Sequence, residues 1–177
     1  MKLSNPPSRL GAILSGGKSS RFGSDKAEAS FGGRRLVDHA ADAIAPWVSA
    51  TVMCGPQRSN FQNVKDRPSD GLGPLAGLCG ALFHAREHGF EAVVAIACDM
   101  PLVPTELMEA LVGGEARYCE SVPVLGCWPS HLASALEQHL ASGGHRSMRA
   151  WAETIGATGI AWSDLPNINT PADLAAL

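Results

Sequence analysis

Short apolar runs alternate with helical patterns along this chain, which is typical of an open, mainly parallel sheet with crossover helices. The apolar runs predict strands over 10–14, 50–54 and 92–98 and a short strand around Val64. Helical spacing predicts helices over 35–44, 74–88 and from Thr105 onward. Beyond Gly113 the weaker pattern predicts a strand over 122–125, helices over 131–140 and 147–154 and a short strand around Ile160. At the C-terminus, capping signals in Thr170-Pro171-Ala172-Asp173 predict the start of a further helix. We therefore expect an α/β fold with helices on both faces of a mostly parallel central sheet.

A glycine-rich, basic loop follows the first predicted strand directly. Gly16 and Gly17 allow the backbone to turn toward an anion, and Lys18, Arg21 and Lys26 supply positive charge within nine residues. The loop is not a Walker A motif, because the position of that motif's first glycine falls inside the apolar run. The pattern predicts a site for the phosphates of a nucleotide.

A carboxylate follows the most apolar predicted strand. Asp99 comes directly after the run 92–98, and ligands of open parallel sheets bind at the carboxyl ends of the strands. Asp99 is therefore expected to face the phosphate loop and to hold a Mg²⁺ ion that bridges phosphate oxygens. The competing interpretation is that Asp99 only caps the turn that Pro101 begins. Phosphate loop, basic residues and metal together indicate attack on a nucleotide phosphate.

Charge and composition limit the partners of the chain. The formal net charge is -3, so no basic field favours a nucleic acid. The longest apolar run is too short to cross a membrane and no signal peptide is evident, so we expect a cytoplasmic protein. The five cysteines form no Cys-x-x-Cys pair and are expected to be small buried apolar residues. A catalytic thiol at Cys98 is disfavoured because the neighbouring Asp99 would raise its pKa.

Several short motifs follow one another along almost the whole chain. They are Leu14-Ser15-Gly16-Gly17, Arg21, Gly23, Asp25-Lys26, Asp66, Gly73-Pro74-Leu75-Ala76-Gly77, Cys98-Asp99-Met100-Pro101 and Asn167-Ile168-Asn169-Thr170-Pro171. Their order and spacing resemble those of the molybdenum cofactor guanylyltransferases. The resemblance implies a single Rossmann-like nucleotidyltransferase domain over residues 1–177. It further implies transfer of GMP from GTP to the terminal phosphate of molybdenum-molybdopterin with Mg²⁺, release of pyrophosphate, and molybdoenzymes or their chaperones as possible partners.

The resemblance also assigns roles to individual residues. It implies a nucleotide site made of Leu14, Ser15, Gly16, Gly17, Lys26, Asp66 and Asp99. Catalysis would involve Lys26, Arg21 and Asp99, of which Asp99 would hold the metal. Asn167 and Asn169 would face the acceptor or the metal. Arg146, in a glycine-rich stretch before a predicted helix, is either a ligand of the acceptor phosphate or a solvated arginine.

One departure from the family pattern affects the choice of base. Cys54 stands where the family usually has an asparagine at the end of the second strand. Guanine is still favoured by Gly16-Gly17, since cytidylyl relatives tend to show alanine-glycine there. Two alternatives therefore stay open: a cytidylyltransferase on the same cofactor or another small nucleotidyltransferase, and a non-catalytic nucleotide-binding module that serves a molybdoenzyme.

Overall fold

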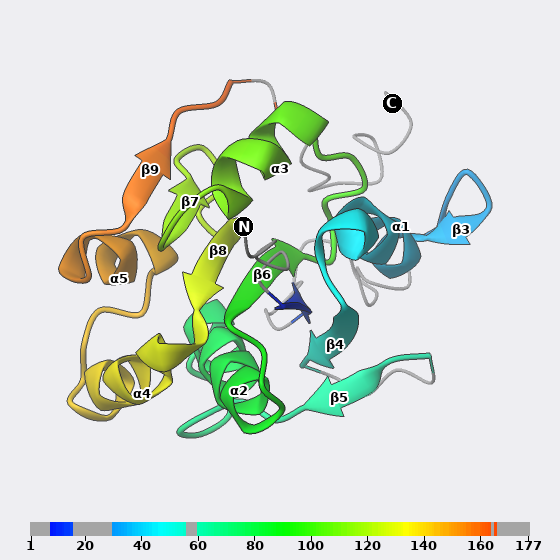
Figure 1. Ribbon diagram of the computed structural model, residues 1–177. Helices are drawn as coiled ribbons and strands as arrows, with labels where there is room; N and C mark the ends of the chain where they lie inside the picture. The colour runs from blue at the N-terminus through cyan, green and yellow to red at the C-terminus, as the bar shows by residue number, and fades with distance from the viewer. Residues whose placement is uncertain (1–7, 16–29, 56–59, 164, 166–177) are drawn as a thin grey trace, which may run out of the picture.

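The computed structural model of the chain describes residues 8–15, 30–55, 60–163 and 165 (Figure 1). Its centre is a seven-stranded sheet in the order β5-β4-β1-β6-β8-β7-β9. The strands are β1 (Arg9–Leu14), β4 (Ala50–Cys54), β5 (Gln62–Val64), β6 (Ala92–Ala97), β7 (Arg117–Cys119), β8 (Gly126–Pro129) and β9 (Thr158–Ile160). The helices are α1 (Leu36–Ile44), α2 (Pro74–Glu87), α3 (Thr105–Val112), α4 (Ala133–Ala141) and α5 (Met148–Thr154), with short 3₁₀ turns at Ala45–Trp47 and Ser130–Leu132. A small hairpin of β2 (Ser30–Phe31) and β3 (Arg34–Arg35) precedes α1.

Half of the sheet is parallel, as the apolar runs predicted. β1 lies between β4 and β6 and runs parallel to both, with Leu14 opposite Cys54 on one side and Ala97 on the other. β5 continues this parallel half, where Val64 pairs with Cys54. Because these strands end at the same level, the loops that leave their carboxyl ends meet at one edge of the sheet.

The other half of the sheet is mixed. β8 is antiparallel to both β6 and β7, and β7 is parallel to β9. Two reversals restore the original direction, so β7 and β9 run the same way as β1 and β6. The carboxyl ends of β7 and β9 therefore open on the same edge as those of the parallel half.

The predicted strand over 122–125 is wrong. This segment is the turn between β7 and β8, closed by a hydrogen bond from the Leu125 amide to the Val122 carbonyl at 2.9 Å. Leu125 is fully buried and Val122 is partly buried against the core, so the turn has the apolar composition of a strand. Pro123 removes one backbone donor from the segment, which suits a turn better than a central strand.

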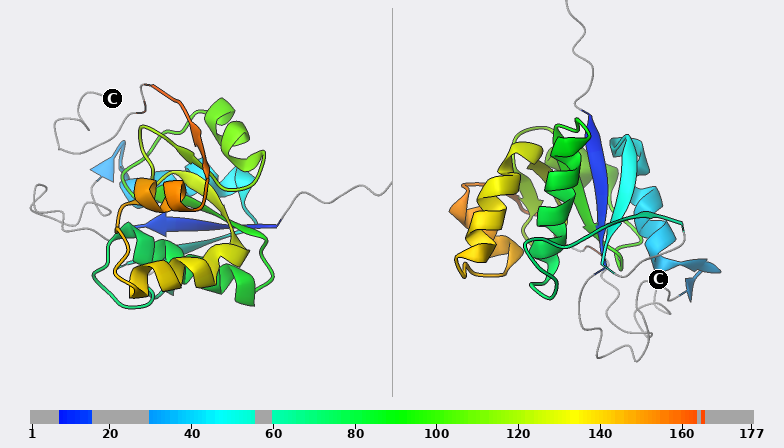
Figure 2. Two further views of the ribbon diagram at one scale, coloured as in Figure 1. Left: turned by 90° about the vertical axis from the view of Figure 1, so that its left-hand side faces the viewer. Right: turned by 90° about the horizontal axis from the view of Figure 1, so that it is seen from below.

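Helices cover both faces of the sheet, which confirms the expected α/β architecture. Alternate residues of β1 point to opposite sides, so Leu10 packs against the face covered by α2, α4 and α5, whereas Ile13 packs under α1 and α3. Figure 2 shows α2 and α1 on opposite sides of β1 and β4. The helix expected from Thr170 lies outside the described residues.

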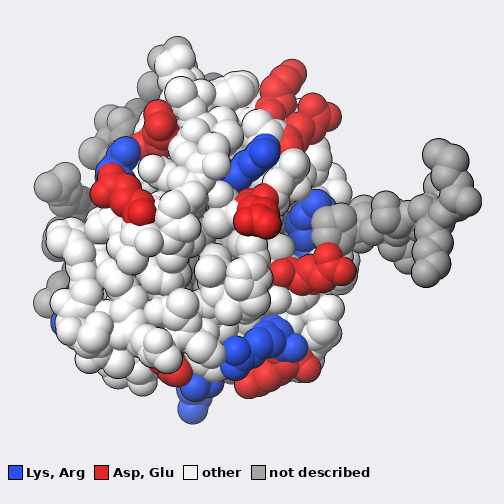
Figure 3. All heavy atoms as spheres, turned by 60° about the vertical axis from the view of Figure 1, so that its left-hand side comes forward, with Lys and Arg blue, Asp and Glu red and all other residues white. Residues whose placement is uncertain are grey.

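The cysteines are buried, whereas no charged side chain among the described residues is. All five cysteines are buried and free, as predicted. Figure 3 shows the side of the molecule next to α4 and α5, where Lys and Arg are interspersed with Asp and Glu. Among the described helices, none has both the length and the apolar character needed to cross a lipid bilayer.

Candidate active site

The carboxyl end of β1 is tied to both neighbouring strands. The Ser15 amide donates to the Cys54 carbonyl at 2.9 Å, and the Ser15 hydroxyl donates to the same oxygen at 3.1 Å. On the other side the Cys98 amide donates to the Leu14 carbonyl at 3.3 Å. The first residue of the glycine-rich loop therefore leaves the sheet in a fixed direction between β4 and β6.

Gly77, in the first turns of α2, lies where three strand ends meet. A Cβ atom at this position would lie 3.0 Å from the Cys54 Cβ, 3.3 Å from the Leu14 Cδ2 and 3.6 Å from Asp66 Oδ1. The structure thus brings together Leu14, Asp66 and the glycine-containing helix start, all of which the sequence assigned to the nucleotide side. A larger residue at this position would force the Cys54 and Leu14 side chains to move by a few tenths of an ångström.

Asp66 is half-buried at this meeting point. Burial raises the pKa of its carboxyl, and the negative charge of Asp70 raises it further. An isolated carboxylate in such a position gains most when a ligand supplies hydrogen-bond donors. Its surroundings therefore suit a hydroxyl-bearing or amino-bearing ligand.

Arg67 fixes the segment that carries Asp66. Its amide donates to the Ala76 carbonyl at 3.1 Å, and its guanidinium donates to the Glu137 carboxylate at 3.0 Å and lies 3.7 Å from the centre of the Phe83 ring. Sequence reasoning did not single out Arg67. The signal was its position directly after Asp66.

Gly80 lets the same segment approach α2. A Cβ atom at Gly80 would lie 2.1 Å from the Lys65 carbonyl oxygen, so no larger residue fits there without a shift of the backbone. Sequence reasoning did not identify Gly80, because a glycine inside a helix is normally interpreted only as a residue of low helix propensity. Here it is a close contact between α2 and the loop after β5.

Asp99 follows β6 at the same edge of the sheet. It comes two residues after Ala97, the partner of Leu14 across the β1–β6 pair, and it is half-buried in the turn closed by the Met100 amide on the Ala97 carbonyl at 3.2 Å. Within the described residues no three His, Cys, Asp or Glu side chains gather into a metal site. Mg²⁺ takes one or two protein carboxylates and fills its other positions with phosphate oxygens and water, so Asp99 is a residue that could hold this ion.

Several expected site residues fall outside the described part of the chain, and their roles stay predictions. They are Gly16, Gly17, Arg21, Lys26, Asn167 and Asn169. Arg146 is described; it is exposed and precedes α5 by two residues.

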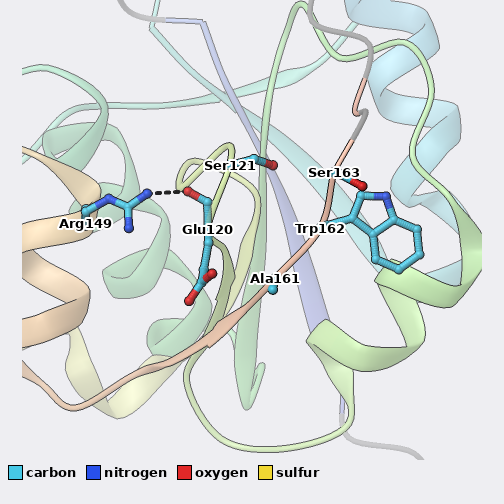
Figure 4. Close-up of a pocket in the computed structure, with 6 residues that line it drawn as sticks. All are labelled: Glu120, Ser121, Arg149, Ala161, Trp162 and Ser163. Atoms are coloured by element: carbon cyan, nitrogen blue, oxygen red, sulfur yellow. Dashed lines mark hydrogen bonds between the residues drawn. The ribbon is translucent and has the colours of Figure 1, made fainter.

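A hollow opens at the carboxyl ends of β7 and β9 (Figure 4). It has a volume of about 560 Å³ and is lined by Glu120, Ser121, Arg149, Ala161, Trp162 and Ser163. Arg146 is not among these lining residues, whereas Arg149, one helical turn later, is. No local pattern in the sequence indicates this hollow, because its residues come from three separate segments.

Comparisons with known proteins agree with this arrangement. A MobA-like NTP transferase domain matches residues 11–155. A molybdenum cofactor guanylyltransferase of Rhizobium leguminosarum bv. trifolii is 30% identical over 93% of this chain and 89% of its own length. The corresponding protein of Cereibacter sphaeroides is 32% identical over 94% of this chain and 93% of its own length.

Solved structures show the same fold. Molybdopterin-guanine dinucleotide biosynthesis protein A from Archaeoglobus fulgidus superposes with a TM-score of 0.69 at 24% identity, over 94% of this chain and 95% of that one. 4-Diphosphocytidyl-2C-methyl-D-erythritol synthase from Anaerococcus prevotii superposes with a TM-score of 0.67 at 13% identity, over 97% and 94% of the two chains. The sequence matches confirm the resemblance seen in the motifs: the chain belongs to the molybdenum cofactor guanylyltransferases, a family of nucleotidyltransferases with the MobA-like NTP transferase domain.

Proposed function

We propose that this chain transfers GMP from GTP to the terminal phosphate of molybdenum-molybdopterin and releases pyrophosphate. The observation that carries the proposal is the meeting of Leu14, Asp66 and Gly77 at one edge of the sheet, with Asp99 at the end of the adjoining strand. Ligands of open α/β sheets bind at this edge, and we expect the nucleotide on one side of Asp99 and the acceptor on the other.

In the proposed reaction, an oxygen of the acceptor phosphate bonds to the α-phosphorus of GTP. The bond from that phosphorus to the bridging oxygen of the β-phosphate breaks, and pyrophosphate leaves with the electron pair. Lys26 and Arg21 would stabilise the negative charge on the phosphates, and Asp99 would hold the metal. When bound, Mg²⁺ would neutralise charge on the α-phosphate and the leaving group.

The side chain of Cys54 would contribute little to the choice of the nucleotide base. Burial and the charge of Asp66 raise the pKa of the Cys54 thiol to about 12, so the side chain stays neutral and offers at most a weak hydrogen bond. Guanine would instead be selected by Asp66 and by backbone groups around the end of β1. The same weakness at residue 54 is the reason to test CTP as a second donor.

The test of the function measures pyrophosphate release from GTP with purified molybdenum-molybdopterin, together with formation of the dinucleotide product. A thermal-shift comparison of GTP, CTP and ATP with Mg²⁺ identifies the base, because only a ligand of the folded state stabilises by mass action. We expect stabilisation by GTP. Stabilisation by CTP alone would support the cytidylyl alternative, and binding of GTP without pyrophosphate release would support the non-catalytic module.

The partners and location of the protein form part of the same proposal. A cytoplasmic enzyme that makes this cofactor would pass it to molybdoenzymes or to their chaperones. Co-purification of the guanylylated cofactor with such a recipient, in cells that express the chain, tests that step.

A further inference from the structure

The hollow beyond β7 and β9 opens on the same edge as the nucleotide side but in the other half of the sheet. Glu120 follows the carboxyl end of β7, Ala161 follows that of β9, and Arg149 comes from the first turn of α5 (Figure 4). Its volume of about 560 Å³ is within the range of small-molecule sites. Nothing in the nucleotide side uses these residues.

The backbone fixes Glu120 in this hollow. Its amide donates to the Ile160 carbonyl at 3.0 Å, and its carbonyl accepts a hydrogen bond from the Arg149 guanidinium, drawn as a dashed line in Figure 4. The Glu120 side chain lies over Gly159 on the neighbouring strand. A Cβ atom at Gly159 would lie 2.5 Å from Glu120 Oε1 and 2.8 Å from its Cγ, so the absence of a side chain there leaves room for the carboxylate.

Glu120 and Arg149 therefore line the same hollow with chemically complementary groups. Within the described residues the Glu120 carboxylate has no ion-pair partner, because the Arg149 guanidinium is directed to the main-chain carbonyl. The carboxylate offers two acceptor oxygens, and the guanidinium has five N–H donors, of which this contact uses one. A ligand that fits this pair has two adjacent donors next to an acceptor.

A 2-amino-4-oxopyrimidine edge has that pattern. Its amino group and ring N–H donate side by side, and its oxo oxygen accepts. We propose that this hollow holds the pterin ring of the acceptor, with Glu120 accepting from the amino and ring N–H groups and Arg149 donating to the oxo oxygen. This inference rests on the proposed function, which supplies a pterin-containing acceptor.

Guanine has the same edge, and the sheet order decides between the two ligands. Leu14, Cys54 and Asp66 lie at the ends of β1, β4 and after β5, on one side of β6, whereas the hollow lies beyond β8 on the other side. In-line displacement requires the acceptor and the leaving pyrophosphate on opposite faces of the α-phosphorus. With Asp99 between them, donor nucleotide and pterin occupy opposite halves of the edge.

Trp162 lines the hollow, but its ring packs against the protein core and is not expected to stack on the ligand. Its side chain is partly buried and packs against the core under α1 and α3. Figure 4 shows its ring directed away from Glu120 and Arg149. The chain after β9 is thereby held at the mouth of the hollow, next to Ser121.

The kinetic test varies GTP and molybdenum-molybdopterin in turn for the wild type and for Glu120→Gln and Arg149→Gln. Loss of charge-assisted hydrogen bonds should raise KM for the pterin acceptor about tenfold to a hundredfold in each variant and leave KM for GTP within about twofold. Glu153→Gln, on the exposed side of α5, and Arg86→Gln, on α2, are the matched controls and should leave both KM values unchanged. Gly159→Ala keeps the charge but displaces the Glu120 side chain, so it should raise only the KM for the acceptor, by a smaller factor.

A binding measurement separates this inference from the proposed function. Fluorescence titration with 6-hydroxymethylpterin should show binding to the wild type that Glu120→Gln weakens and that added guanosine does not displace. A wild type that binds this pterin in the expected way but releases no pyrophosphate would contradict the function and support the pocket. A wild type that turns over while the variants keep a normal acceptor KM, or that loses GTP affinity instead, would overturn the pocket assignment alone.

Discussion

At the scale of single residues, Asp66 places a carboxylate at a half-buried position where its ionised form destabilises the fold. Asp66 is half-buried next to Leu14 and Cys54, and the negative charge of Asp70 adds to the cost of ionising it. Residues that cost stability in this way are common where a ligand later supplies the missing hydrogen bonds. The position of Asp66 is thus better explained by binding than by folding.

Replacement of Asp66 by asparagine should stabilise the free protein and weaken GTP binding. Because the folded-state pKa is raised above the unfolded value, the unfolded chain releases its proton first as the pH rises, and the free energy of unfolding decreases through that interval. The stability gain of Asp66→Asn should therefore be present at pH 7 and disappear below about pH 4. KM for GTP should rise about tenfold. Urea denaturation at several pH values, with GTP kinetics at pH 7, tests both effects, and a loss of stability at pH 7 would contradict the assignment.

The buried cysteines should be unreactive in the native protein. Burial raises the pKa of both Cys54 and Cys79 to about 12, so almost no thiolate is present at pH 8, and both side chains are closed off from solvent. Mass spectrometry after treatment with iodoacetamide should show neither residue modified in the folded state and both modified in guanidinium chloride. Rapid native labelling of Cys54 would mean that the end of β4 opens far more readily than its packing implies.

At the scale of elements, two arginines that contact the same phenylalanine link α2 to its neighbours. Arg67 lies 3.7 Å and Arg86 4.7 Å from the centre of the Phe83 ring. Arg67 also binds Glu137 on α4, and Arg86 donates to Ser134 on the same helix at 3.0 Å. Both residues join α2 and α4, but only Arg67 is adjacent to Asp66.

This difference provides a matched pair of variants. Arg67→Ala and Arg86→Ala should each lower the free energy of unfolding by about 1 kcal/mol, the size expected for a partly exposed cation–aromatic contact. Only Arg67→Ala should also weaken stabilisation by GTP, because it frees the segment that carries Asp66. Chemical denaturation and GTP-dependent thermal shifts measure the two effects. Equal GTP responses in both variants would show that the α2–α4 contact, rather than the position of Asp66, controls the site.

The elements also show what the sequence could predict. The strands 10–14, 50–54 and 92–97 are apolar runs that are largely buried, and such runs can be recognised without knowledge of their partner strands. β7 and β8 are short, and β7 contains Arg117, whereas the apolar turn between them looked more like a strand than either. Their pairing depends on tertiary contacts, so β7 and β8 were not predicted and the turn between them was predicted as a strand.

The same reasoning applies to the site. Leu14 ends one predicted strand, Asp66 and Asp99 each follow another, and the rule for open sheets brings such positions together. Glu120, Gly159 and Arg149 follow from no local pattern, because their arrangement depends on how β7, β9 and α5 pack. The half of the edge that the sequence could not predict is the half that we assign to the acceptor.

At the scale of the whole molecule, one sheet edge joins two halves with different construction. The parallel half carries the proposed nucleotide site, the mixed half carries the proposed pterin hollow, and β6 with Asp99 at its end lies between them. Replacement of Asp99 should therefore lower the rate of the reaction and have little effect on the stability of either half of the sheet.

Asp99→Ala tests that position. Loss of the metal ligand should lower kcat at least about a thousandfold, since metal-assisted charge neutralisation is worth several kcal/mol in the transition state. The free energy of unfolding should change far less, because a half-buried residue in a turn contributes little to either core. KM for the acceptor should stay within about threefold of the wild-type value in any residual turnover, unlike that of Glu120→Gln.

Chelation of Mg²⁺ by EDTA gives the matching measurement on the unchanged chain. It should abolish turnover in the wild type and have no further effect on Asp99→Ala, because both changes remove the same contribution. Restoration of wild-type activity by excess Mg²⁺ should succeed after EDTA treatment and fail in the variant. If Asp99→Ala turned over at the wild-type rate, the reaction between the nucleotide and the acceptor would not need the Asp99 carboxylate. The proposed transfer at this edge of the sheet would then be rejected.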